Sequence, residues 1–215
     1  MDFNLFARRR GGSGAGDPRS VEINESNELL TAQGLPQYTE MSRLGDGWTV
    51  QTSTLFAPIA AYPSTTTRLE VFNNNPGYAM VVVDVFAAQV LSTAATQTYA
   101  IFAMVTTQKA APTLTALVLA SLSGKAAITP TAGGPVITAV DTTVVANGWR
   151  PYGGWQAWGT AAATPGNAAS AEVNGRLIAP YGTSVCVAPA GSLATASTFQ
   201  CGLTFYWVPL STKVA

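Results

Sequence analysis

The residues of this chain best suited to chemistry form an aromatic cluster late in the sequence. Trp149, Trp155 and Trp158 are three of the five tryptophans, and Tyr152 lies among them in the Gly-containing run Trp-Arg-Pro-Tyr-Gly-Gly-Trp-Gln-Ala-Trp. Such rings stack on sugars or form hot spots of protein interfaces. Rings that fold over the end of a β-structure share the same pattern. We rank this packing role first, a contact with another subunit second and sugar binding third.

A second candidate chemistry is glycoside hydrolysis, which needs only two carboxylates facing one cleft about 5 to 10 Å apart. The carboxylates from residue 46 onward are Asp46, Glu70, Asp84, Asp141 and Glu172. Asp84 stands inside the apolar run Val-Val-Val-Asp-Val-Phe, residues 81–86. A carboxylate in such a run is more often a satisfied core group than a catalyst, and we expect it to pair with an arginine such as Arg68.

The residues needed for most other chemistries are missing from the sequence. The chain has no histidine, which is the most common general base and a common metal ligand. Cys186 and Cys201 have no C-x-x-C spacing, and Gly124-Lys125 lacks the earlier glycine of a phosphate-binding loop. We therefore expect no enzyme, no catalytic residue, no cofactor and no metal.

Charge is scarce and unevenly placed along the chain. Charged residues make up 10% of the sequence, against about 25% in an ordinary soluble domain. Residues 1–46 hold 12 of the 22 charged residues, and the other 169 residues hold 10. A surface so poor in charge tolerates close packing against neighbours, because charged residues are depleted in the centres of interfaces. This favours a protein that associates with copies of itself.

The first 46 residues are predicted to form an extended N-terminal arm, with a short helix over residues 20–31. Arg8, Arg9 and Arg10 form a basic cluster in it. These arginines are either a solvated tail or an anchor on an acidic partner surface or packaged nucleic acid. Because the formal net charge is zero, we expect neither nucleic acid nor a membrane as a partner of the whole molecule.

Two features bear on where the protein is made. The charges at the N-terminus follow a short apolar start, which is the reverse of a secretory signal, so we expect a protein made and kept without export. Cys186 and Cys201 fall in the two halves of a predicted C-terminal strand pair. In a protein that is not exported, we expect both to be buried thiols. A disulfide between facing strands is the alternative.

Residues 47–215 are predicted to form one all-β domain, an antiparallel β-sandwich. Short runs rich in Val, Thr and aromatic residues alternate with turn residues. The predicted strands are 48–56, 67–72, 78–91, 98–107, 113–122, 136–145, 154–159, 176–178, 184–188 and 199–208. In the last of them Phe199, Cys201, Leu203, Phe205 and Trp207 share one face.

The run Tyr-Ala-Ile-Phe-Ala-Met-Val, residues 99–105, is apolar on both faces. Either this strand is central and covered on both sides, or its outer face meets another subunit. The second possibility again favours a homo-oligomer.

The order of these elements resembles that of jelly-roll decoration (cement) and head-surface proteins of tailed bacteriophages, and is similar to trimeric tumour-necrosis-factor-like domains. Three segments carry the resemblance: residues 69–86, with an Asn-Pro-Gly turn before a long core strand; 175–185, with a Pro-Tyr-Gly turn; and the final aromatic strand, 202–209. It covers roughly residues 48–210, and residues 1–47 lie outside it.

The resemblance implies a jelly-roll sandwich and a structural virion protein on the capsid surface, made in the host cytoplasm. Its partners would be itself, as a trimer, and the major capsid protein, with the arm as a tether. Two other interpretations stay open: a single-jelly-roll capsid protein whose arginine arm faces the genome, and a carbohydrate- or receptor-binding module resting on the tryptophan cluster.

Overall fold

The computed structural model describes residues 42, 45–91, 97–106, 111–146, 148–158, 168–191 and 197–210, with the backbone alone for residues 97 and 155–158. The described residues belong to one of the two units into which the chain divides, residues 40–215. Residues 1–41 of the predicted arm lie outside the described residues, and with them Arg8, Arg9, Arg10 and the helix expected at 20–31. Within the described part, no helix is long and apolar enough to cross a membrane.

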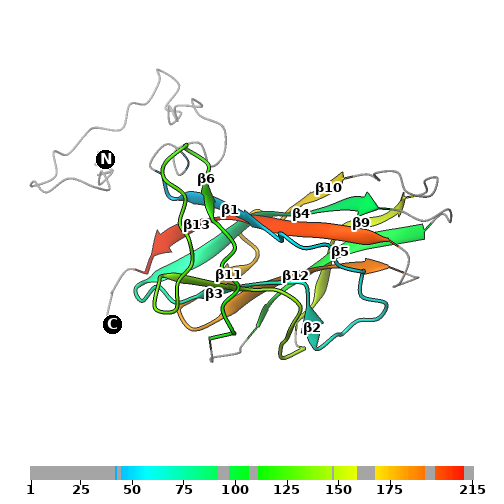
Figure 1. The fold of residues 1–215 in the computed structure, drawn as a ribbon, viewed down its shortest axis with the longest axis horizontal. Coiled ribbons are helices and arrows are strands. Elements are labelled where there is room, and N and C mark those ends of the chain that lie inside the picture. Colours follow the sequence, from blue (N-terminus) through cyan, green and yellow to red (C-terminus); the bar gives the residue numbers. More distant parts are fainter. Residues whose placement is uncertain are drawn as a thin grey trace, which may run out of the picture. The chain divides into compact units, whose positions relative to one another are not determined.

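The described part is built of antiparallel strands in two layers, which confirms the predicted all-β sandwich (Figure 1). The strands are β1 (Gly47–Gln51), β2 (Thr66–Thr67), β3 (Leu69–Asn73), β4 (Tyr78–Leu91), β5 (Gln97–Thr106), β6 (Ala120–Ser121), β7 (Val136–Ala139), β8 (Thr142–Thr143), β9 (Arg150–Trp158), β10 (Ala168–Glu172), β11 (Ile178–Ala179), β12 (Ser184–Gly191) and β13 (Thr198–Pro209). The first sheet has the order β10-β4-β13-β1-β6, with β11 also on β4, and the second has the order β7-β3-β12-β5-β9. Strands β2 and β8 form a small separate pair.

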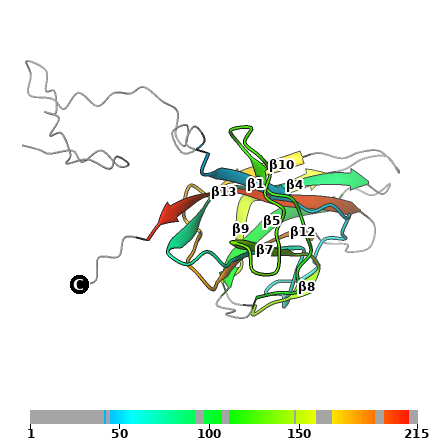
Figure 2. The same cartoon turned by 60° about the vertical axis from the view of Figure 1, so that its left-hand side comes forward.

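The main strands pair in a nested way along the chain. The early strand β1 pairs with the last strand, β13, and β3 pairs with β12. Further inward, β4 pairs with β10 and β5 pairs with β9. The chain therefore runs out through four strands and returns through four, and the two halves lie against each other across both sheets. Figure 2 shows the layer of β1, β13, β4 and β10 on one side and β5 and β12 on the other.

The core lies between the two sheets and is formed by alternate residues of their long strands. On β13 the predicted inward face is confirmed, because Phe199, Cys201, Leu203, Phe205 and Trp207 are all buried. Facing side chains of the second sheet include Leu69, Val71 and Val187. Period-two alternation in the sequence is thus realised as a sheet with one face in the core.

A register shift in β4 changes the face on which Asp84 lies. Phe205 pairs with Val82, and its neighbour on β13, Thr204, pairs with Asp84. One step along β13 therefore matches two steps along β4, so β4 holds one extra residue between Val82 and Asp84. Strict alternation from the buried Val82 would point Asp84 into the core. The bulge instead turns Val85 inward and Asp84 to the outer face. The prediction of Asp84 as a core group paired with Arg68 was wrong, because Arg68 pairs with Asp141.

The outer face of the second sheet is covered by the chain itself. Strand β5 lies between β12 and β9. On its outer side the Phe102 ring stacks on Tyr62 with 4.1 Å between centroids, and Met104 packs with Val144, Cys186 and Trp149. Of the two explanations for the apolar run 99–105, the central, doubly covered strand is therefore confirmed.

Several predicted strands differ from the structure for reasons of pairing. The strand expected at 113–122 is reduced to β6, whose two residues pair with β1. The strand expected at 136–145 is split into β7 and β8 because Asp141 has a positive φ of 49°. The predicted C-terminal strand pair is not a hairpin, since β12 and β13 belong to different sheets, and β10 was not predicted. Cys186 and Cys201 are free and buried, as expected.

Candidate interaction surface

The structure places the two described residues of the tryptophan cluster in different surroundings. The Trp149 indole N–H donates to the Ser64 carbonyl oxygen at 2.8 Å, and its ring meets Tyr62 edge-on. Tyr152 is only 8% exposed and belongs to the main core, with the Arg176 guanidinium over its ring at 5.6 Å. Both rings are thus held by internal contacts. The side chains of Trp155 and Trp158 lie outside the described residues, and all four remain predictions as binding residues.

The carboxylates separate into three settings. Asp141 pairs with Arg68 at the surface. Glu70 is fully buried on β3, where its Oε1 accepts a hydrogen bond of 2.6 Å from the Ser184 hydroxyl, and burial raises its pKa despite that bond. Asp84 and Glu172 are direct cross-strand partners on β4 and β10. Of Glu70, Asp84, Asp141 and Glu172, the geometry therefore brings one pair together, Asp84 and Glu172.

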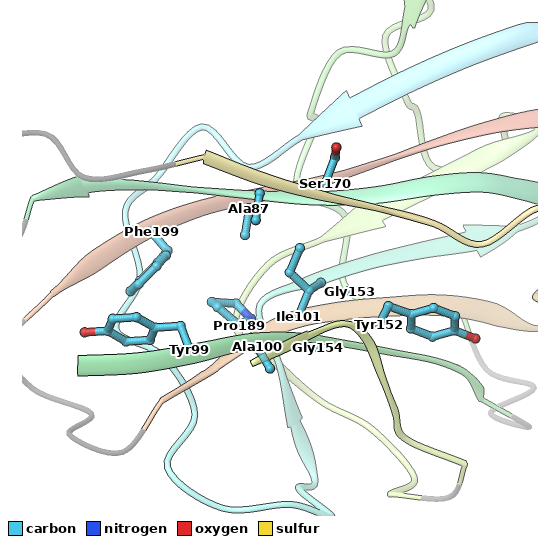
Figure 3. Close-up of a pocket in the computed structure, with 11 residues that line it drawn as sticks. Ala87, Tyr99, Ala100, Ile101, Tyr152, Gly153, Gly154, Ser170, Pro189 and Phe199 are labelled. Atoms are coloured by element: carbon cyan, nitrogen blue, oxygen red, sulfur yellow. The ribbon is translucent and has the colours of Figure 1, made fainter. Parts of the chain in front are cut away.

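Neither of two cavities in the described domain is lined by this pair. One lies between the sheets and is lined by residues that include Tyr99, Phe199 and Tyr152; Figure 3 shows the first two rings side by side at one end. It offers about 10 Å³ to solvent, room for about one water molecule. The other is a surface hollow of about 420 Å³ beside Phe72 and Tyr181, with no carboxylate in its lining.

The outer face of the first sheet carries a row of apolar side chains that crosses its strands. Tyr206 on β13 pairs with Val81 on β4, and Val81 pairs with Ile178 on β11. On the other side Tyr206 pairs with Gly47, where Leu122 lies close: a methyl group at Gly47 would sit 3.0 Å from Leu122 Cδ1. Cross-strand partners share a face. We call Leu122, Tyr206, Val81 and Ile178 the apolar row.

The ends of this row are open to solvent. Leu122 is 46% exposed and Ile178 is 52% exposed. Tyr206 is half-buried between them, and Val81 is covered by its neighbours. Figure 1 shows β1, β13 and β4 adjacent in one layer, and the strand pairings align the four side chains across it. An apolar strip rimmed by polar residues is typical of an interaction site.

The next row of the same face carries the carboxylates. Thr49 pairs with Thr204, Thr204 pairs with Asp84, and Asp84 pairs with Glu172. We call Asp84 and Glu172 the acidic pair. Like charges placed directly opposite each other destabilise a sheet, so this arrangement favours a cationic partner.

Within the described residues the acidic pair has little compensation. Asp84 Oδ1 is buried, and no described group gives it a hydrogen bond. Glu172 Oε2 accepts a bond of 3.0 Å from the Asn174 amide. The nearby Arg176 donates to the main-chain carbonyls of Val173 and Glu172, both at 2.9 Å, rather than to a carboxylate. A cation from elsewhere would therefore find acceptor oxygens here.

The sequence reasoning missed this surface. One signal was available: Tyr206 and Val208 are apolar although they alternate with the inward residues of β13. The pairings that align them with Val81 and Ile178 had no signal of their own. No protein family, curated protein or solved structure matches this chain.

Proposed function

We propose that this protein is a structural virion protein, a decoration (cement) protein that binds and stabilises a tailed-phage capsid as a homo-oligomer. We further propose that its sandwich is of the jelly-roll type. The nested pairing of β1 with β13, β3 with β12, β4 with β10 and β5 with β9 supports this. Eight antiparallel strands in two sheets, related as two Greek keys, make a jelly roll.

The observation that carries the self-association is the exposed apolar row on a domain with few charges. Leu122 and Ile178 are exposed on the outer face of the first sheet, where a soluble monomer would normally present polar side chains. Covering the apolar row itself removes no charged side chain from water. The row therefore suits contact with another protein better than contact with solvent.

The mechanism of a cement protein is multivalent burial. Each contact between one subunit and the capsid is small, yet the subunits of one oligomer bind together, and the second contact forms at a high effective concentration. The N-terminal arm would add a tether for each subunit. The major capsid protein is the expected partner, and this part of the proposal rests on the resemblance to phage head proteins.

Two measurements test the proposal on the full chain. Light scattering gives the mass of the purified protein, which should be that of a homo-oligomer. Co-sedimentation with particles of the encoding virus, stripped of this protein, should then show binding. Ile178→Asp should lower both mass and binding, whereas Val145→Asp, at a side chain 49% exposed over the second sheet, should change neither. A monomeric mass together with no co-sedimentation with the particles would refute the proposal.

A further inference from the structure

We propose that residues 3–10 of a second copy dock on the outer face of the first sheet. Phe3, Leu5 and Phe6 would cover the apolar row, and the basic cluster Arg8, Arg9 and Arg10 would lie against the acidic pair. This inference rests on the homo-oligomer of the proposed function and names the contact that holds it together. It assigns a binding partner to a surface and a role to three arginines.

The acidic pair disfavours the simplest alternative, in which the face pairs with itself. In a two-fold contact the same patch meets its own copy. Where the two-fold axis passes near them, Asp84 and Glu172 would face a second acidic pair as water is removed, and like charges across an interface weaken it. The face therefore needs an occupant that is apolar along one row and basic along the next.

Residues 3–10 have that composition. They join three large apolar side chains to three consecutive arginines, a run of cations that occurs nowhere else in the chain. Two arginines of the described domain already bind oxygen atoms, Arg176 those of main-chain carbonyls and Arg68 that of Asp141. Arginine suits the site because its guanidinium binds carboxylates through two parallel hydrogen bonds.

The chain enters the domain at the right place. The Asp46 carbonyl oxygen accepts a hydrogen bond of 3.2 Å from the Trp207 amide, so the chain meets the sheet beside Gly47 and Tyr206, at the apolar row. Residues 11–45 join Arg10 to this point and span at most about 115–125 Å. A neighbouring copy is within that reach. Each copy offers one face and one segment, so the contacts are head-to-tail, and they form a ring when the rotation between copies closes.

Photo-cross-linking between labelled copies tests the contact. An unlabelled full chain carries benzoylphenylalanine in place of Ile178, and it is mixed with an equal amount of ¹⁵N-labelled natural chain. Subunit exchange is checked by native mass spectrometry. Cross-linked peptides from residues 3–10 should appear with and without ¹⁵N in similar amounts, because docking occurs between copies. The matched control places the photo-residue at Val145 and should capture no such peptide.

The charge requirement is tested in the same mixture. When the labelled chain carries Arg8→Glu, Arg9→Glu and Arg10→Glu, its share of captured peptide should fall at least about tenfold against the unlabelled segment. Glu172→Lys in the photo-reactive chain should recover part of that loss. An unchanged share would overturn the role of the arginines.

The remaining outcomes are distinguishable. Capture of unlabelled peptide alone would mean that each segment lies on its own domain, and would overturn the inference. An oligomer by mass that captures no peptide from residues 3–10 would overturn the inference and leave the proposed function standing. A monomer by mass would overturn the homo-oligomer, and the inference with it.

Discussion

Replacement of Gly202 by alanine tests how closely β1, β13 and β4 pack on the outer face. Gly202 lies opposite Phe86 in the β13–β4 register. A methyl group there would lie 2.2 Å from Phe86 Cζ and 2.5 Å from the Val50 carbonyl oxygen. Carbon atoms normally approach other carbons to about 3.5–4.0 Å. The half-buried Phe86 ring can turn outward, whereas the carbonyl belongs to the main chain of β1 and moves only with the strand.

The expected loss in unfolding free energy follows from two opposing effects. Overpacking costs about 1–3 kcal/mol, and two contacts this short, one of them to the backbone, place Gly202→Ala near the upper end. Alanine also lowers the conformational entropy of the unfolded chain relative to glycine, which stabilises the folded protein by about 0.4–1 kcal/mol. We therefore expect a net loss of about 2 kcal/mol, or a fall in Tm of about 4–8 °C for a chain of this size.

Urea unfolding followed by tryptophan fluorescence measures this loss. Gly133→Ala is the matched control, since a methyl group there meets nothing within 4 Å, and it should change stability by less than about 0.5 kcal/mol. In a Phe86→Ala background the cost of Gly202→Ala should shrink but persist, because the Val50 carbonyl remains. A Gly202→Ala protein as stable as the natural one, or a cost that vanishes in the Phe86→Ala background, would refute this account of the packing.

Three further predictions concern the buried groups. Burial raises the pKa of Glu70, so the stability that its proton confers is full below the unfolded pKa, about 4.3, and is lost as pH rises through the folded pKa. The stability of Glu70→Gln minus that of the natural protein should therefore grow as pH rises above about 4 and level off above the folded pKa, and a flat difference would contradict this. Burial raises the pKa of Cys201 to about 12 and that of Cys186 well above its usual value. Both thiols should therefore resist Ellman's reagent in the native protein at about pH 8 and react once the protein is unfolded in concentrated guanidinium chloride. Rapid reaction of the native protein would contradict this, because it would show that the thiols are accessible. Leu203 is fully buried, so Leu203→Ala should cost about 2–5 kcal/mol in urea unfolding, whereas Ile178→Ala, at an exposed position, should cost less than about 0.5 kcal/mol.

Strands with a strong local pattern were predictable from sequence. β4 was predicted with the bounds that the structure shows, 78–91, and the inward residues of β13 were all assigned to the correct face. Both strands are rich in β-branched or aromatic residues, which fit a half-buried pleated surface. Local propensity and tertiary pairing agree in these segments, so the sequence pattern is sufficient.

Strands that depend on a partner were not predictable. β10 has the sequence Ala-Ala-Ser-Ala-Glu, without a β-branched or aromatic residue, and it is a strand because it pairs with β4 along its length. Residues 113–118 have the apolar composition of a strand, and the Thr115 amide donates to the Thr138 carbonyl oxygen of β7, but they form no ladder with a strand of the described domain. Strand formation at both places is decided by the neighbour rather than by the segment.

The interaction surface belongs to this second kind. Its apolar row joins residues from four separate segments, and each pair meets only through the register of two strands. A shift of one residue in any register would send a side chain to the opposite face. Asp84 shows the consequence: alternation from Val82 places it in the core, and the extra residue that β4 holds against β13 places it outside, next to Glu172. A bulge is therefore what turns an apparent core carboxylate into part of a surface that favours a basic partner.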